Sequence, residues 1–139
     1  MSHVLPTILL VDDDAPTRYL MQRALRRLQV RAQVLEAEDG AQALAAVQAH
    51  CRASDQPSSL LVLLDLNMPV MDGLEFLEHQ VHLPQICRQV TAVIVVTGTP
   101  DPKEQARARA LAVDLVPKPL GPDGVAELLR RYLPVALSA

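Results

Sequence analysis

The sequence predicts an α/β fold in which a parallel β-sheet is covered by helices on both faces. Short apolar runs alternate along the chain with stretches of helical periodicity, and these runs lack the polar alternation of a strand with one exposed face. Several of the runs also end abruptly in a polar or charged side chain. Because alternating strands and helices form parallel sheets through right-handed crossovers, we expect these polar residues to gather at one edge of the sheet.

Apolar runs at residues 8–11, 33–36, 60–64, 92–96 and 114–116 are predicted to form the strands. The run at 60–64 is the clearest, because it consists only of leucine and valine. Helices are predicted over residues 18–28, 39–49 and 74–81, after Asp101, and over 123–133.

Helix starts are indicated by acids that can accept from free backbone N–H groups. Asp14 and Asp39 are expected to act as N-caps. Asp101, followed by Pro102 at the first helical position and by Glu104, has the spacing of a capped helix start.

The composition indicates one globular domain without affinity for nucleic acids. The chain has 139 residues, half of them hydrophobic, so we expect a single domain over residues 1–139, with a core of about residues 7–132 and a short tail at 133–139. A net charge of −3 and only two tyrosines and one phenylalanine disfavour nucleic-acid binding. No apolar run is long enough to span a bilayer, and residues 1–6 lack the pattern of a secretion signal. We therefore expect a cytoplasmic protein without membrane insertion.

The two cysteines, Cys51 and Cys87, stand far apart in the sequence and form neither a CxxC pair nor a zinc-binding spacing. Two unpaired thiols suit a reducing cytoplasm. The sequence is therefore interpreted as having no disulfide.

Three acids follow predicted strands. Asp12 and Asp13 end the first strand and Asp65 ends the third. In a doubly wound sheet of order 2-1-3-4-5 these strands are neighbours, so the acids are expected to lie together. Their mutual repulsion must be offset by a proton or a cation. Oxygen ligands open to water favour Mg²⁺.

The fourth and fifth strands bring donors to the same edge. Thr97 offers a hydroxyl, Gly98 a backbone N–H that no side chain screens, and Lys118 an ammonium group. Pro117 cannot donate to a sheet and fits only an edge strand, which the fifth strand is in this order. An acid nucleophile, two further acids that can bind a metal ion, a hydroxyl and an amine are the parts required for phosphoryl transfer to an aspartate.

With these residues in this order, the chain resembles a response-regulator receiver domain of the stand-alone, single-domain type, a family of two-component signalling proteins with a flavodoxin-like (βα)5 fold. The resemblance covers about residues 7–132. It is carried by Asp12 and Asp13, by residues 65–73, by Thr97 with Gly98, and by Lys118 with Pro119.

The resemblance implies a role for each residue of the site. Asp65 is the phosphoacceptor. Thr97 and Lys118, with the backbone of Asn67 and Gly98, contact the phosphoryl group. The implied ligands of Mg²⁺ are Asp12, Asp13, Asp65 and the backbone carbonyl of Asn67. The peptide bond between Lys118 and Pro119 is expected to be cis.

The resemblance also implies partners. The phosphodonor is a sensor histidine kinase or a phosphotransfer protein, and the chain is not an enzyme beyond catalysing its own phosphorylation and dephosphorylation. An unidentified downstream protein is expected to read the surface of the fourth helix, fifth strand and fifth helix.

One position departs from the family pattern. Receiver domains usually carry Tyr or Phe three residues before the lysine, and here that position is Leu115. A ring that changes rotamer on activation is therefore absent. We expect the signal to pass through Thr97 and the loop that follows it.

Two other functions remain open at this level. A phosphatase of the haloacid-dehalogenase type also uses an aspartyl-phosphate, but Pro16 stands where that family has Thr or Val. A flavodoxin-like cofactor binder is disfavoured by the acidic loop after the first strand and by the absence of a GxGxxG turn.

Overall fold

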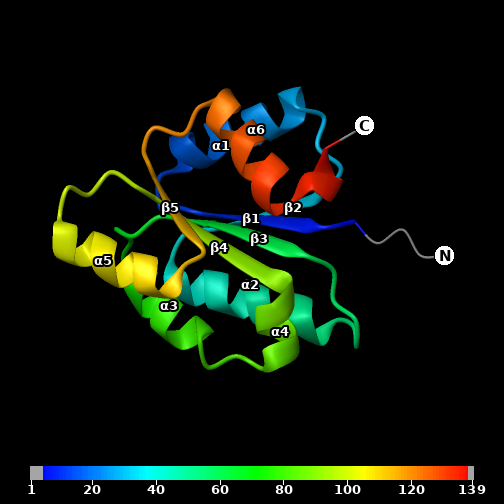
Figure 1. Ribbon diagram of the computed structural model, residues 1–139, viewed down its shortest axis with the longest axis horizontal. Helices are drawn as coiled ribbons and strands as arrows, with labels where there is room; N and C mark the ends of the chain where they lie inside the picture. Colours follow the sequence, from blue (N-terminus) through cyan, green and yellow to red (C-terminus); the bar gives the residue numbers. More distant parts are fainter. Residues whose placement is uncertain (1–4, 138–139) are drawn as a thin grey trace.

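The computed structural model describes residues 5–137. The beginning of the segment considered for a secretion signal and the last two residues of the tail lie outside this range. The strands are β1 (Thr7–Val11), β2 (Gln33–Ala37), β3 (Leu60–Leu64), β4 (Thr91–Thr97) and β5 (Asp114–Pro117). They form one parallel sheet of order β2-β1-β3-β4-β5, which confirms the predicted fold (Figure 1).

Helices cover both faces of the sheet (Figure 1). One face is covered by α1 (Ala15–Arg27), α6 (Pro122–Tyr132) and the short 3₁₀ helix η1 (Pro134–Ala136). The other face is covered by α2 (Gly40–Arg52), α3 (Gly73–Gln80), α4 (Gln85–Val90) and α5 (Pro102–Leu111). Within the described residues, none of these helices has both the length and the apolarity needed to cross a lipid bilayer.

Helix α4 was not predicted. It has six residues, too few to show helical periodicity, and it lies between α3 and β4. The helices predicted as the fourth and fifth are therefore α5 and α6 in the structure.

The hydrophobic core consists of two layers separated by the sheet. Successive residues of a strand point to opposite faces, so Leu10 packs toward α1 and α6 whereas Leu9 packs toward α2 and α3. Both layers are buried around β1, β3 and β4, which explains why these three strands lack polar alternation. Leu133 and Ala136 are buried in the layer between the sheet and helices α1 and α6, so the core extends past residue 132. One domain over residues 1–139 stays a prediction.

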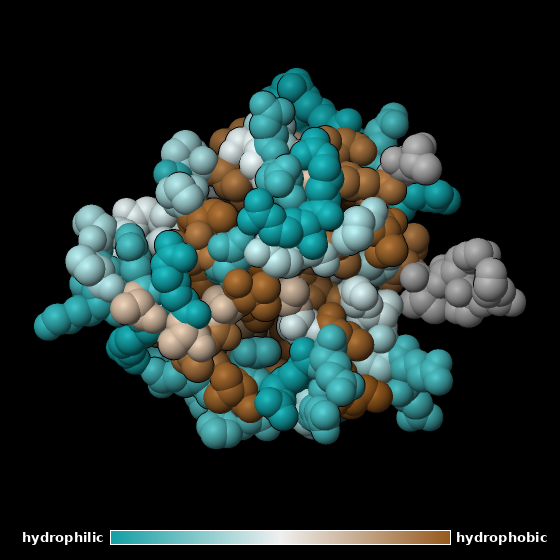
Figure 2. Space-filling model, viewed as in Figure 1, coloured by the Kyte–Doolittle hydropathy of each residue, from teal (hydrophilic) through white to brown (hydrophobic). Residues whose placement is uncertain are grey.

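The surface follows the same division. Figure 2 shows hydrophilic residues over the outward faces of the helices, with hydrophobic residues exposed mainly between the two helical layers. This is where the edge of the sheet reaches the surface of the molecule.

The predicted N-caps are confirmed. The Asp14 and Asp39 carboxylates cap α1 and α2, and Asp101 caps α5 by accepting from the Lys103 N–H at 3.0 Å. The Glu104 carboxylate does not complete a capping box and accepts from the Thr99 hydroxyl at 3.0 Å.

The interpretation of the cysteines as two unpaired thiols is wrong. Cys51 lies in the last turn of α2 and Cys87 in α4, and they form a disulfide with a Cα–Cα distance of 5.4 Å. Sequence spacing could not show this pairing, because the packing of α4 against α2 joins positions 36 residues apart.

Candidate functional site

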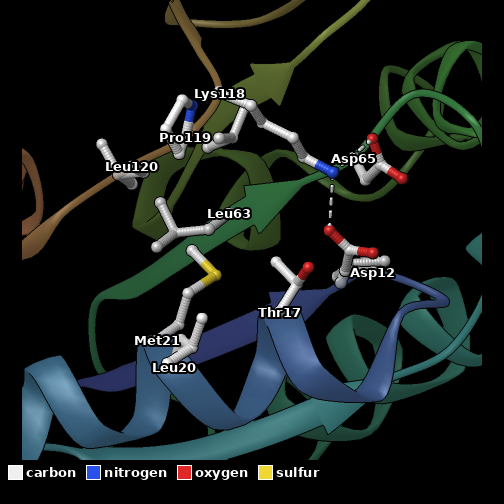
Figure 3. A pocket seen from close by; sticks show the side chains of 11 residues that line it. Asp12, Thr17, Leu20, Met21, Leu63, Asp65, Lys118, Pro119 and Leu120 are labelled. Atoms are coloured by element: carbon white, nitrogen blue, oxygen red, sulfur yellow. Dashed lines mark hydrogen bonds and ion pairs between the residues drawn. The ribbon is translucent and has the colours of Figure 1, made fainter.

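The carboxyl ends of four strands bring together the residues predicted for the site. Asp12 follows β1 and Asp65 follows β3, and these strands pair with Val11 opposite Leu64. The Asp65 N–H donates to the Val11 carbonyl at 2.9 Å, which fixes the two acids beside each other. Lys118 follows β5 and extends its side chain toward both acids (Figure 3).

Asp12, Asp13 and Asp65 form the predicted acidic cluster. One carboxylate oxygen from each residue lies within 4.8 Å of the others. Asp12 and Asp65 are only 4% and 5% exposed, whereas Asp13 is exposed. A metal ion could bind to this cluster, because three acids converge at one point that water can reach.

Lys118 supplies the cation that offsets the buried acids. Its Nζ lies 2.9 Å from Asp12 Oδ2 and 3.2 Å from Asp65 Oδ1. Burial lowers the pKa of Lys118, but the hydrogen bond to Asp12 and the charge of Asp65 outweigh burial and leave that pKa raised. Lys118 is therefore held in its charged form.

Asp65 has a raised pKa despite the nearby ammonium group. Burial is the main cause and the charge of Asp12 adds to it, while Lys118 and the Asn67 backbone N–H act in the opposite direction. The ionised carboxylate of Asp65 is therefore less stable in the fold than in water.

Replacing Asp65 with Asn is expected to stabilise the metal-free fold at pH 7 by about 0.5–2 kcal/mol. The folded-state pKa of Asp65 lies above its ordinary value of 3.8, so folding becomes less favourable as the pH rises from 3.8 through the folded-state pKa. The advantage of Asp65→Asn should thus disappear below pH 3.8, where the wild-type carboxyl is neutral in both states. Urea unfolding in EDTA, from below pH 3.8 to pH 7, measures the difference in unfolding free energy between the variant and wild type. The control is Asp55→Asn, a variant of an exposed loop residue. A variant less stable than wild type at pH 7 would contradict the prediction.

A cavity of about 340 Å³ is lined by Thr97, Gly98 and Leu115, and Lys118 also lines it. Thr97 is buried, and its Oγ1 accepts from the Thr99 N–H at 3.0 Å. Leu115 is 9% exposed, so the position of the usual aromatic residue is filled by a buried aliphatic side chain. The aromatic ring that usually stands at this position is therefore absent.

Two expectations about the end of β5 are confirmed. The peptide bond between Lys118 and Pro119 is cis. Pro117 lies on β5, which is an edge strand with a neighbour on one side only. A proline, which has no N–H to donate, is tolerated at such an edge.

Sequence reasoning missed the role of Arg18. Arg18 lies in the first turn of α1. It donates from Nη1 to the Asp12 carbonyl at 2.6 Å and from Nε to Glu36 Oε1 at 2.9 Å. It thereby ties the backbone of the first acid to β2. A single arginine in an amphipathic helix carries no signal that would reveal this contact.

An apolar cavity beside the site was also missed. It has a volume of about 160 Å³ and opens between α1 and the segment after β5 (Figure 3). Leu20 and Met21 line it from α1, and Pro119 and Leu120 line it from the opposite side. Asp65 also lines this cavity. The wall comes from segments about a hundred positions apart, so no local pattern predicts it.

The loop between β3 and α3 holds Val70 in an unusual conformation. Its φ is 67°, a left-handed value that β-branched residues avoid, and its side chain is 82% exposed. The Met71 carbonyl in the same loop accepts from the Gly40 N–H of α2 at 2.7 Å. Contact with α2 therefore helps to hold the loop that follows Asp65.

Comparison with known proteins identifies the family of the chain. The sequence matches the family described as response regulator receiver domain over residues 8–130. It is 35% identical over 116 residues to protein-glutamate methylesterase/protein-glutamine glutaminase 2 of Burkholderia thailandensis, a match that covers 81% of this chain and 29% of that protein. It is 31% identical over 91 residues to the response regulator Rcp1 of Synechocystis sp., covering 66% of this chain and 61% of that protein.

A solved structure shows the same fold. The chemotaxis protein CheY4 of Vibrio cholerae is 27% identical with a TM-score of 0.73, and the match covers 94% of this chain and 100% of that chain. This chain spans less than a third of the methylesterase and less than two thirds of Rcp1. The family match nevertheless covers most of the sequence, and the chain belongs to the response regulator receiver domain family.

Proposed function

We propose that this chain is a phosphorylation-controlled switch of two-component signalling that acts in the cytoplasm. Asp65 accepts a phosphoryl group from a sensor histidine kinase or a phosphotransfer protein. The observation that carries the proposal is the position of Lys118 Nζ, which lies 2.9 Å from Asp12 and 3.2 Å from Asp65. This arrangement pairs a buried carboxylate nucleophile with a fixed cation at the edge of the sheet where parallel α/β folds bind ligands.

The proposed transfer forms a bond between an Asp65 carboxylate oxygen and phosphorus, while the bond from phosphorus to the donor's histidine nitrogen breaks. Charge in such a transition state spreads over the phosphoryl oxygens, so the protein contributes by positioning and by neutralising charge. Lys118 supplies an ammonium group and Thr97 a hydroxyl. The backbone N–H groups of Asn67 and Gly98 complete the proposed contacts. The chain acts on its own aspartate and is not otherwise an enzyme.

The acidic cluster fits a Mg²⁺ ion. Its donors are carboxylate oxygens within 4.8 Å of one another, and one of the three acids is exposed. Mg²⁺ prefers oxygen ligands and keeps several waters, which suits an open cluster better than a closed cage. We propose Asp12, Asp13, Asp65 and the Asn67 backbone carbonyl as its ligands. When bound, Mg²⁺ neutralises charge on the carboxylates and the phosphoryl oxygens.

Incubation with Mg²⁺ and acetyl phosphate tests the proposal. The wild-type protein should gain one acid-labile phosphate, seen as a single mass increment, and Asp65→Asn should gain none. The variant Asp14→Asn is a matched control, because Asp14 caps α1 beside the cluster and is expected to leave labelling intact. Labelling of Asp65→Asn equal to that of wild type would refute the assignment. Repeated turnover of varied phosphate esters would instead favour a phosphatase.

We propose that the signal leaves the site through the loop from β4 to α5. Thr97 Oγ1 accepts from the Thr99 N–H, and the Thr99 hydroxyl donates to Glu104 in the first turn of α5. This chain of contacts joins the phosphoryl site to α5 without an aromatic residue at Leu115. A downstream protein would then read the surface of α5, β5 and α6.

Thr99→Val is expected to uncouple α5 from phosphorylation. The substitution keeps the volume of the side chain but removes the hydroxyl that contacts Glu104. Labelling by acetyl phosphate should stay within about twofold of wild type, while the change in hydrogen exchange of α5 caused by beryllofluoride should be lost. Thr91→Val, at the opposite end of β4, is the control. An unchanged response of α5, or a beryllofluoride complex in which Thr97 and residues 98–101 do not move, would contradict this route.

A further inference from the structure

We propose that Cys51 and Cys87 form a reversible redox site at which a dithiol reductant opens the disulfide and releases α4 from α2. The bond joins the last turn of α2 to a helix of only six residues. It lies on α2 and α4, whereas the acidic cluster lies at the strand ends. The proposal therefore does not depend on phosphorylation of Asp65.

The disulfide is the one covalent attachment of α4 to α2, and the polar contacts of α4 are local. The Cys87 and Arg88 N–H groups both donate to the Pro84 carbonyl. Arg88 Nε donates to the Leu83 carbonyl at 3.0 Å, and the Thr91 hydroxyl donates to the Cys87 carbonyl at 2.7 Å. Among the described residues, these bonds stay within segment 83–91 and do not attach it to α2. Opening the disulfide leaves α4 held to α2 by apolar packing.

The two cysteine residues differ in their exposure to solvent. Cys87 is 1% exposed and packs in the core layer with Leu83, whereas Cys51 is partly exposed. A cavity of about 130 Å³ opens beside the bond, and both cysteines line it together with Gln48, Arg52, Leu83, Pro84 and Ile86. A thiolate entering this cavity meets the positive charge of Arg52. Because Cys51 is the more exposed of the two residues, we expect the thiolate to attack Cys51 and Cys87 to leave.

The reaction balances as a two-electron exchange. A thiolate of the dithiol attacks Cys51 Sγ, forming a mixed disulfide, and the electron pair of the broken bond leaves on Cys87 Sγ, which takes up a proton. The second thiol of the dithiol loses its proton and attacks the mixed disulfide, and Cys51 leaves and is protonated. The protein gains two thiols, and the dithiol becomes a disulfide. A disulfide oxidant reverses both steps.

Hydrogen exchange and thiol alkylation of the folded protein test the proposal, with dithiothreitol as the dithiol. Oxidised protein should show no alkylatable thiol, and the reduced protein should show two. Exchange in segment 83–90 should become at least about tenfold faster on reduction and return on reoxidation. Exchange in the central part of β4, residues 93–96, should not change, because the sheet holds this strand on both sides.

A variant and a monothiol make the test specific. Cys51→Ser should show the fast exchange of reduced wild type with or without dithiothreitol. Glutathione should give a mixed disulfide that peptide mapping places on Cys51. The proposal is overturned if the oxidised protein keeps free thiols or if dithiothreitol opens the bond only after denaturation. It is also overturned if α4 exchanges equally in both states, if Cys51→Ser still responds to reductant, or if glutathione is found on Cys87.

Discussion

Replacing Lys118 with methionine is expected to slow the phosphorylation of Asp65 by acetyl phosphate by about 10²–10³-fold. The Lys118 ammonium lies within 3.2 Å of both buried acids, and no other lysine or arginine forms an ion pair with Asp65 among the described residues. Without it, a negatively charged donor must approach carboxylates whose repulsion is no longer offset. The rate at which phosphorylated protein appears in excess Mg²⁺, measured by intact mass, gives the size of the effect.

The control for this experiment is the other lysine of the sequence. Lys103 lies exposed in the first turn of α5, so Lys103→Met removes the same charge at a distance from the acids. Its labelling rate should remain within about twofold of wild type. Circular dichroism establishes that both variants are folded. If folded Lys118→Met were labelled as fast as Lys103→Met, the proposed role of the ammonium group would be wrong.

Replacing Gly73 with alanine is expected to lower the free energy of unfolding by about 3 kcal/mol and the melting temperature by roughly 10 °C. A Cβ at this position would lie 2.8 Å from Leu66 Cα and closer still to the carbonyl oxygen of Asp65. Both obstacles are backbone atoms, so no side-chain rotation can relieve the overlap. Because the displaced carbonyl belongs to the phosphoacceptor, labelling by acetyl phosphate should slow as well.

Gly98→Ala separates this steric effect from the general effect of replacing a glycine. A Cβ at Gly98 meets only Lys118 Cβ, at 4.0 Å, which is an ordinary contact. The free energy of unfolding of Gly98→Ala should differ from that of wild type by less than about 1 kcal/mol. Thermal and urea unfolding compare the two variants. Equal losses of stability would show that the close approach of Gly73 to Asp65 does not limit the packing of this loop.

The features that the sequence predicts share one property: each is encoded within a short segment. Leu60–Leu64 is buried on both faces, so its residues are uniformly apolar, and Asp65 follows without a break. The topology then brings Asp65 to Asp12, because β1 and β3 are neighbours in the sheet. Knowledge of strand ends and strand order was therefore enough to assemble the acids and Lys118 at one edge.

The features that the sequence did not predict depend on packing between distant segments. The pairing of Cys51 with Cys87 exists only because α4 packs on α2, and α4 is too short to show a periodic pattern. The hold of Arg18 on the Asp12 carbonyl likewise requires the side chain to turn back across the end of β1. Neither contact changes the local composition of its segment, so neither leaves a trace in the linear sequence.

The ion pair between Lys118 and Asp12 has a consequence for the order of events during synthesis. Its partners are 106 positions apart. At about 5–20 residues per second, the ribosome adds Lys118 roughly 5–20 s after Asp12. Until β5 has been made and has joined the sheet, the two buried acids lack their fixed cation. A nascent chain therefore becomes competent for the proposed reaction only after β5 has joined the sheet, which protects chains that still lack this strand from taking up a signal.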